Sequence, residues 1–441
     1  MTSTTSTTSG TTTWRNWAGN VTARPRRIVS PASVDELASA VRQAAADGLT
    51  AKAVGTGHSF TAAAATDGLL ISPERLTAVR EVDAKAGTVT VEAGLPLHRL
   101  NRLLDSAGLS LTNMGDIQEQ TVAGATSTGT HGTGRDSGSI ATQIKGLELV
   151  LADGSVLNCS AEENADVFAA ARIGLGALGV ISAITFGVEP SFLLTAREEP
   201  MPFTAVTDRF DQLVAENEHF EFYWFPHTDN CNTKRNNRSL GPAAPLHPVR
   251  GWLDDELLSN GVFQAVCALG KAVPATVAPM AKVSSRALSA RTYTDTAYKV
   301  FTSPRRVRFV EMEYAVPIDA ATTVLREVKT MVERSALRIS FPVEVRVAPA
   351  DNIALSTASG RDTAYVAVHM YRGSRYQEYF TAVERIMTAH EGRPHWGKLH
   401  TRDAEYFSQV YPRFGEFTAL RDRLDPQRLF ANDYLRRVLG D

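Results

Sequence analysis

The chain contains few cysteines and carries almost no excess charge. Cys159, Cys231 and Cys267 are odd in number and widely spaced among 441 residues. This usage fits neither a disulfide framework nor a zinc site and suits a reducing compartment, so we expect a cytoplasmic protein. The formal net charge of -2, from 46 basic and 48 acidic residues, gives no electrostatic reason to expect nucleic acid as a partner.

A signal peptide and a membrane span are also missing from the pattern. Residues 1–13 are almost entirely Ser, Thr and Gly, with neither a basic start nor an apolar run, which predicts a disordered tail. The most apolar later stretches, 175–194 and 261–283, are each interrupted by proline and charge. No transmembrane segment is therefore predicted, while peripheral association with a membrane stays open.

What is present indicates a soluble protein of two domains with α+β architecture, because 441 residues exceed what one core usually organises. Ser33, with Glu36 three residues on, predicts the start of a helix that continues over 37–46. Asp153-Gly154 predicts a hairpin. Further strands are expected at 28–31, 52–55, 69–72, 78–83, 88–93, 144–151, 156–159 and 179–189, and helices at 97–107 and 168–173. The βαβ periodicity of a Rossmann domain is not visible.

From Pro190 onward the pattern of expected strands and helices differs from that of the first unit. Strands are expected at 220–225, 307–315, 341–348 and 363–371, helices at 206–216, 320–335 and 377–389, and a loop at 236–254. This second unit reads as an antiparallel sheet with helices on it.

Two glycine-rich segments are the first candidates for chemistry: Gly55-Thr56-Gly57-His58-Ser59, and 124–134 with its core Thr128-Gly129-Thr130-His131-Gly132. Glycines let main-chain N–H groups approach a pyrophosphate, but neither segment fits a standard nucleotide motif, and both could be tight turns. His58 has two interpretations: a structural histidine, or a nucleophile that bonds to the 8α-methyl carbon of an isoalloxazine ring.

A second constellation lies toward the C-terminus. Glu344 and Arg346 are two apart on a predicted strand, so both project to one face. With His369 and Lys398 they could bind vicinal hydroxyls and stabilise an alkoxide. The alternative is a cross-strand salt bridge. His395 and His400 have no companion ligands in the sequence, so no metal site is expected.

Residues 53–60 resemble the covalent-flavin loop of the vanillyl-alcohol oxidase (PCMH-type FAD) superfamily. Within it the match is closest to aldonolactone oxidoreductases that act on L-gulono-1,4-lactone or D-arabinono-1,4-lactone. The similarity extends over nearly the whole chain from Trp14 and includes Thr130-His131-Gly132-Thr133-Gly134, Trp224-Phe225-Pro226-His227-Thr228, Glu311-Met312-Glu313-Tyr314, 392–398 and Asn432-Asp433-Tyr434.

The resemblance implies a PCMH-type FAD-binding domain of two subdomains over 14–190. A cap domain with a large antiparallel sheet flanked by helices follows over 191–420, and residues 421–441 return to the FAD domain. It implies FAD bonded covalently through His58 and no metal. The implied cofactor contacts are Val54, Gly55, Thr56, Gly57, His58, Ser59, Phe60, Gly115, Asp116, Thr121, Gly124, Thr128 and Ile181, and the implied catalytic residues are Glu344, Arg346, Lys398 and His369.

The implied reaction is FAD-dependent oxidation of a sugar lactone to the 2-keto lactone, which tautomerises to an ene-diol such as L-ascorbate, with dioxygen reduced to hydrogen peroxide. Glycine at position 115, where a related plant dehydrogenase carries alanine, favours an oxidase. The alternatives are an alditol (xylitol or sorbitol) oxidase, a lactone dehydrogenase that uses another acceptor, and a non-catalytic flavin- or sugar-binding protein. The catalytic base stays open.

Overall fold

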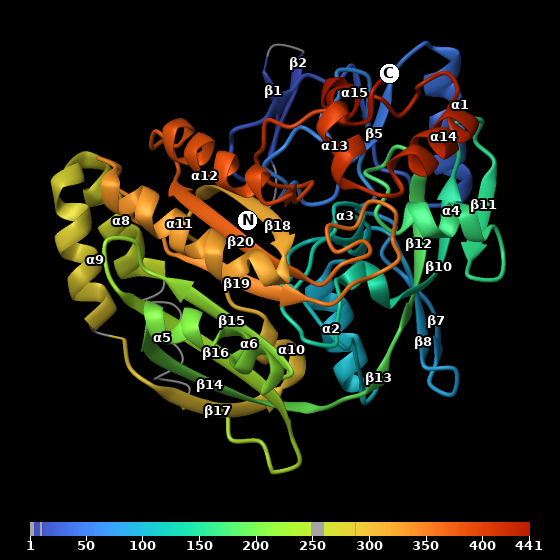
Figure 1. Cartoon of the computed structure of the whole chain (residues 1–441). Helices are drawn as coiled ribbons and strands as arrows, with labels where there is room; N and C mark the ends of the chain where they lie inside the picture. The colour runs from blue at the N-terminus through green and yellow to red at the C-terminus, as the bar shows by residue number, and fades with distance from the viewer. Residues whose placement is uncertain (1–3, 9–10, 248–259, 287) are drawn as a thin grey trace.

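The computed structural model describes residues 4–8, 11–247, 260–286 and 288–441. A small parallel sheet lies in its N-terminal part (Figure 1). Strands β4 (Arg27–Val29), β6 (Leu69–Ile71) and β5 (Ala51–Ala53) lie in that order. Helix α1 (Val34–Ala46) packs its apolar face on them, and the Ser33 side chain accepts a hydrogen bond from the Glu36 amide. The predicted helix start is confirmed.

A five-stranded antiparallel sheet stands beside it (Figure 1), in the order β11-β10-β12-β8-β7. The predicted Asp-Gly hairpin is confirmed as the pair β10–β11. The strands are β7 (Val79–Asp83), β8 (Thr88–Glu92), β10 (Ile144–Val150), β11 (Val156–Ser160) and β12 (Val180–Gly187). Helices α2 (Leu97–Ser106), α3 (Val122–Ser127) and α4 (Ala165–Ala171) contribute to the same core.

An antiparallel sheet of eight strands, called the cap sheet below, has the order β17-β14-β16-β15-β19-β20-β18-β21. Its strands are β14 (Leu193–Pro202), β15 (His219–Trp224), β16 (Asn230–Ser239), β17 (Arg291–Thr296), β18 (Phe309–Pro317), β19 (Val343–Ala348), β20 (Thr363–Tyr371) and β21 (Arg393–Pro394). One face packs under α5 (Phe203–Asp208), α6 (Phe210–Ala215), α11 (Ala321–Arg334) and α12 (Gln377–Ala389) (Figure 1). The expected α+β class is confirmed.

The two faces of the cap sheet differ in chemistry because side chains alternate along a strand. On β18, Val310, Met312 and Tyr314 join the apolar core under the helices, whereas Glu311 and Glu313 line a cavity on the opposite side. On β19, Val343, Val345 and Val347 face the helices, and Glu344 and Arg346 face the cavity. The sheet thus carries a core on one face and the charged groups of the site on the other.

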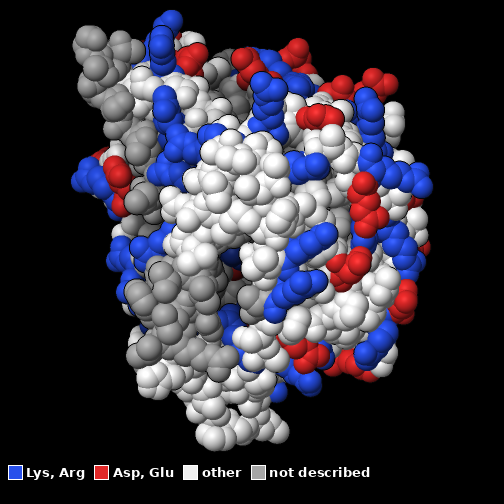
Figure 2. Space-filling view, turned by 90° about the vertical axis from the view of Figure 1, so that its left-hand side faces the viewer, with Lys and Arg blue, Asp and Glu red and all other residues white. Residues whose placement is uncertain are grey.

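The remaining helices surround these sheets. They are α8 (Phe263–Ala272), α9 (Val277–Arg286), α10 (Ala297–Phe301), α13 (Ala404–Val410), α14 (Phe414–Leu424) and α15 (Asp433–Leu439). Helices α13, α14 and α15 pack into the core of the five-stranded sheet. Within the part of the chain that the structure describes, no helix is long and apolar enough to cross a bilayer. On the face in Figure 2, basic and acidic side chains are intermingled.

Three local expectations differ from the structure. Residues 4–8, expected in a disordered tail, form β1 (Thr4–Thr8) against β2 (Thr11–Arg15), which suits the strand preference of threonine. The expected loop at 236–254 begins too early, since β16 continues to Ser239 between two strands; 248–259 lie outside the described residues. The expected helix 206–216 is interrupted at Arg209, whose backbone leaves the helical range at φ -115 and ψ 17.

Candidate active site

Two cavities meet at His58. The first lies among the two glycine-rich segments and the turn before β12, and the second lies between the first domain and the charged face of the cap sheet. His58, Ser59, Gln120 and Thr128 line both. Of the residues predicted to contact a cofactor, the first cavity brings together Val54, Gly55, Thr56, Gly57, His58, Ser59, Thr121, Gly124, Thr128 and Ile181.

Close main-chain approach shapes the first cavity. A Cβ atom at Gly55 would overlap the Thr121 hydroxyl, and one at Gly124 would lie 2.9 Å from the same oxygen. Thr121 uses that oxygen to accept a hydrogen bond from the Gly124 amide at 3.2 Å, at the start of α3. Glycine is therefore required on both sides of Thr121, which brings the two glycine-rich segments into contact.

Unsatisfied polar atoms in the walls test whether this cavity fits a flavin nucleotide. The Trp14 Nε1 donor and the Gln120 Oε1 acceptor are buried without a hydrogen-bond partner among the described residues, and both side chains line the first cavity. Buried polar groups are normally paired, so each indicates a polar ligand. FAD offers carbonyl and phosphate acceptors as well as N–H donors, so the residues present fit it.

His58 is held as a neutral, oriented imidazole. Its Nδ1 lies 2.9 Å from the Thr56 hydroxyl, and its ring stacks on Trp17 with centroids 5.6 Å apart. Gly57, immediately before it, has φ +70, a conformation that favours glycine. Burial, with a smaller contribution from the Lys398 cation, lowers the pKa of His58 to about 4. At neutral pH the ring therefore retains a free nitrogen lone pair.

Three predicted cofactor contacts lie elsewhere. Phe60 and Asp116 line the second cavity, whereas Gly115 is in the wall of neither. Asp116 forms an ion pair with Arg305 at 2.6 Å and accepts a hydrogen bond from the Ser303 hydroxyl at 2.7 Å. Although burial opposes ionisation, Arg305 brings the pKa of Asp116 down to about 2. Asp116 thus joins the first domain to the cap.

The predicted residues Glu344, Arg346, Lys398 and His369 all line the second cavity. Arg346 forms an ion pair with Glu344 and a second one, at 3.0 Å, with Glu221 on β15. The Tyr223 hydroxyl donates to Glu344 at 3.1 Å. Burial is the main cause that raises the pKa of Glu344, against the opposing effect of Arg346. Glu344 and Arg346 therefore form an ion pair, and this pair lines the second cavity instead of facing bulk solvent.

Lys398 reaches two carboxylates that the sequence analysis left without a role. It forms an ion pair with Glu311 and lies 4.0 Å from Glu313, and His369 Nε2 lies 3.5 Å from Glu311. Burial alone would raise the pKa of Glu311, but Lys398 and His369 together bring it down to about 2. The two-residue spacing of Glu311 and Glu313 on a predicted strand was the signal that could have found them.

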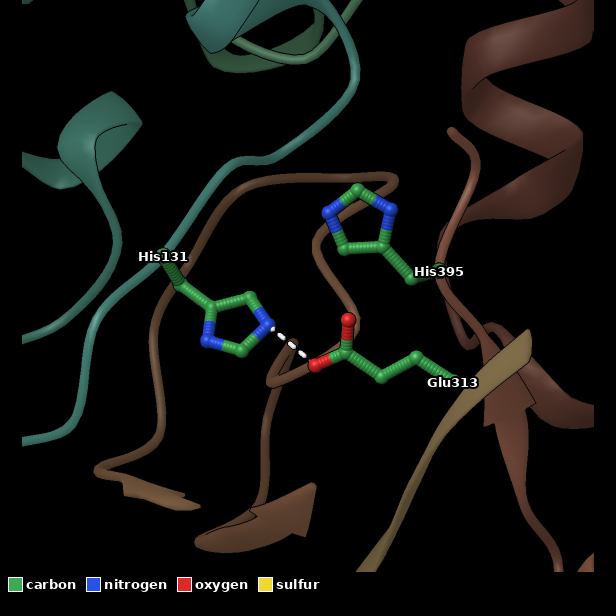
Figure 3. Close-up of side chains that lie close together, drawn as sticks. All are labelled: His131, Glu313 and His395. Carbon is green, nitrogen blue, oxygen red and sulfur yellow. Dashed lines mark ion pairs between the residues drawn. The ribbon is translucent and has the colours of Figure 1, made fainter. Parts of the chain in front are cut away.

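His131, Glu313 and His395 form a buried cluster (Figure 3). Lys398 lies next to it, 4.0 Å from Glu313. His131 Nε2 is 2.8 Å from Glu313, its Nδ1 is 2.9 Å from the Gly132 carbonyl oxygen, and its ring stacks on Tyr365. A carbonyl oxygen only accepts, and the pKa of Glu313 is held well below its usual range, against burial, chiefly by His131. Both ring nitrogens of His131 therefore lie within hydrogen-bond distance of an oxygen atom.

His395 completes this cluster as a neutral ring. Its Nδ1 accepts a hydrogen bond from the Gly397 amide at 3.0 Å, and burial lowers its pKa to about 4. Ligand atoms of the three side chains lie within 4.8 Å of one another, so His395 has the companions that the sequence did not reveal. The arrangement places the His131 ring between the Glu313 carboxylate and the Gly132 carbonyl oxygen, with His395 beside it.

Comparisons with known proteins agree with these two cavities. Residues 184–438 match the family described as D-arabinono-1,4-lactone oxidase, and residues 25–160 match an FAD-binding domain. The L-gulono-1,4-lactone dehydrogenase of Mycobacterium tuberculosis is 43% identical, over 97% of this chain and 99% of that one. The L-gulonolactone oxidase of Bos taurus is 33% identical, over 96% and 98%.

A solved structure shows the same fold. The cholesterol oxidase from B. sterolicum superposes with a TM-score of 0.84 over 99% of this chain and 97% of that one, at 15% identity. The predicted fold, the predicted FAD cofactor and the predicted resemblance to aldonolactone oxidoreductases are confirmed. The chain belongs to the D-arabinono-1,4-lactone oxidase family, among the FAD-dependent aldonolactone oxidoreductases.

Proposed function

We propose that the chain is an oxidase of aldono-1,4-lactones of the L-gulono type, with FAD attached to His58. The observation that carries the proposal is the position of neutral His58 where the two cavities meet. The substrate carbinol loses two electrons and two protons to become the 2-keto lactone, which tautomerises to an ene-diol such as L-ascorbate. Dioxygen takes up both electrons and both protons and becomes hydrogen peroxide.

FAD, when bound, supplies the two-electron chemistry; the residues of the second cavity do the rest. Arg346 and Lys398 place cations where an alkoxide develops on the substrate. Glu344 suits the role of proton acceptor better than Glu311, because burial raises the pKa of Glu344 while Lys398 holds that of Glu311 low. His369, against Glu311, completes the wall that would contact the substrate hydroxyls.

Two other enzymatic functions compete with this one. An alditol oxidase would share the covalent-flavin loop and the charged cavity, but the match of residues 184–438 to a lactone oxidase family favours a lactone. A lactone dehydrogenase would use an acceptor other than dioxygen, and one relative carries that name. Gly115 supports the oxidase. The presence of both the His58 loop and the set of Glu344, Arg346 and Lys398 argues against a binding protein without activity.

Attachment of FAD is tested by acid precipitation. The wild-type protein should give a yellow pellet, whereas His58→Ala should release all its flavin to the supernatant, since alanine offers no nucleophile. His390→Ala, which changes a partly exposed histidine that pairs with Glu327, is the matched control and should keep a yellow pellet. Flavin that remains in the pellet of the His58→Ala variant would show that the attachment site is elsewhere.

The substrate class is tested by peroxide release. We expect turnover of L-gulono-1,4-lactone and D-arabinono-1,4-lactone, and at least about tenfold lower kcat/KM for xylitol and sorbitol, because a site built for one pattern of hydroxyls loses more than about 1.4 kcal/mol with another. Preference for the alditols would reverse the assignment. Turnover with an artificial dye but no peroxide would indicate a dehydrogenase.

Glu344→Gln tests the proton acceptor. The wild-type rate should fall at acidic pH, because the carboxylate must be ionised and its raised pKa brings protonation closer to neutrality. The variant should lose this acid limb and show kcat lower by about 10²–10⁴-fold. Glu327→Gln, on α11 over the opposite face of the sheet, should change neither. A variant that keeps both the rate and the limb would exclude Glu344.

Gly115→Ala tests oxygen access. The new Cβ would lie 2.9 Å from Thr130 Cγ2, so Thr130, which lines the second cavity, must shift. We expect stopped-flow reoxidation by dioxygen to slow more than reduction by lactone. Adding Thr130→Ser removes the clashing methyl and retains the hydroxyl that accepts from Gln120 Nε2, so it should restore reoxidation. Equal slowing of both half-reactions would contradict gating at this position.

A further inference from the structure

The loop that carries His58 has no regular structure of its own. Residues 54–68, all of them described, belong to no helix or strand, although they connect β5 to β6. Their main-chain polar groups must therefore find partners elsewhere. Asn16 and Asn20 donate from their side chains to the carbonyl oxygens of Ser59 and Phe60, at 2.9 and 2.8 Å.

Asn432 holds the far side of this loop. Its Nδ2 lies 2.9, 3.1 and 2.8 Å from the carbonyl oxygens of Ala62, Ala63 and Ala65. Its Oδ1 accepts a hydrogen bond from the Leu435 amide at 2.8 Å and so caps α15. One side chain thus joins the start of the C-terminal helix to three carbonyl groups that follow His58 by a few residues.

Lys52, on β5 just before the loop, contacts the C-terminal segment as well. Its buried ammonium donates to the carbonyl oxygens of Leu175, Gly176 and Phe430, at 3.2, 3.0 and 3.2 Å. Three N–H groups and three acceptors match the charged form, although burial lowers the pKa of Lys52 to about 7, with Asp425 opposing.

Asp425 in turn fixes the segment that Lys52 contacts. Its carboxylate accepts from the amides of Leu429 and Phe430, at 2.7 and 2.8 Å. The Leu429 carbonyl accepts from the Ala51 amide at 2.8 Å, next to Lys52. The C-terminal segment is therefore bonded to the chain on both sides of His58.

We propose that Asn432, supported by Lys52, is a positioning residue for attachment of FAD: it sets the loop so that His58 can bond to the flavin. The inference rests on the proposed attachment at His58. Because Asn432 follows Ala62 by 370 residues, its hydrogen bonds to the loop form only once the C-terminal segment has docked beside β5 and β6. Attachment is therefore fast only after this docking.

The test compares Asn432→Ser with Asp403→Ser in the full-length protein. Serine caps a helix about as well as asparagine or aspartate, but it cannot reach three carbonyl groups. Asp403 caps the neighbouring seven-residue helix α13 through the Tyr406 amide, so its variant controls for a changed cap. Each protein is expressed with limiting riboflavin, so that little flavin is attached, and FAD is then added to the purified protein. The initial rate of attachment is measured as the rate at which flavin appears in the acid-precipitated pellet.

We expect Asn432→Ser to attach flavin about tenfold to a hundredfold more slowly than the wild type, because small misplacements of a reacting group have effects of that size. Asp403→Ser should attach at the wild-type rate. Hydrogen exchange of residues 54–66 should be faster in Asn432→Ser than in Asp403→Ser, and thermal unfolding should show that both variants fold. If Asn432→Ser does not fold, Asn432→Asp, which has the same shape and keeps the cap, replaces it.

The outcomes separate this proposal from the one it rests on. Acid-soluble flavin in the wild type would overturn attachment at His58 and the positioning role together. Acid-resistant flavin in the wild type, with attachment at the wild-type rate in a folded Asn432 variant, would overturn the positioning role alone. Slower attachment with unchanged exchange of residues 54–66 would also overturn it, since the loop would not have moved.

Discussion

The pairing of charges around the second cavity is the constraint on which the shape of that cavity depends. Five carboxylates, from Asp116, Glu221, Glu311, Glu313 and Glu344, face this region, and the side chains of Arg305, Arg346, Lys398 and His131 lie against them. Removing charges from water costs several kcal/mol per ion, so each must be paired. The pairs therefore fix one another, and the cavity keeps a shape that neutral residues would not specify.

This balance also explains why the polar groups of the site differ in reactivity. Glu311 and Glu313 stand beside cations that hold their pKa values low, so they serve as fixed negative charges. In Glu344, burial outweighs the effect of Arg346 and the pKa rises. One sheet face thus offers an inert pair of carboxylates and a more basic one within the same cavity, which is the separation of roles that acid–base catalysis requires.

Local signals in the sequence were enough to predict much of the fold. The Ser33 cap, the Asp153-Gly154 hairpin and the apolar strand at 363–371 each depend on residues close in sequence. Strand β14 was not predicted, because it contains Pro200 and Pro202 and proline is rare inside sheets. The structure accommodates both prolines because β14 pairs with β17 only over 193–198, so among the described residues one side of the strand is free of a neighbour at Pro200 and Pro202. Strand β16 escaped because its Asn and Arg residues have weak strand preference.

The site followed the same rule. Glu344 and Arg346 were found because they share a strand, and Lys398 because its motif resembles a known family. The partners Glu221, Arg305 and His131 come from other segments, and no local pattern places them beside those residues. The alternation of Glu311 and Glu313 was visible, but only the fold shows that their face borders a cavity.

Overall sequence similarity does not indicate whether dioxygen is the electron acceptor, whereas the local geometry around Gly115 bears on it. A relative named a dehydrogenase is 43% identical and one named an oxidase is 33% identical, so overall similarity does not decide between the acceptors. The deciding feature must be local to the flavin. Gly115 lies behind Thr130 rather than in the cavity wall, so a methyl group there would act through Thr130 and the hydrogen bond that Thr130 accepts from Gln120. Access of dioxygen would then depend on the Thr130 side chain, one position before His131. Thr130 belongs to the same glycine-rich segment whose Gly124 and Thr128 line the first cavity.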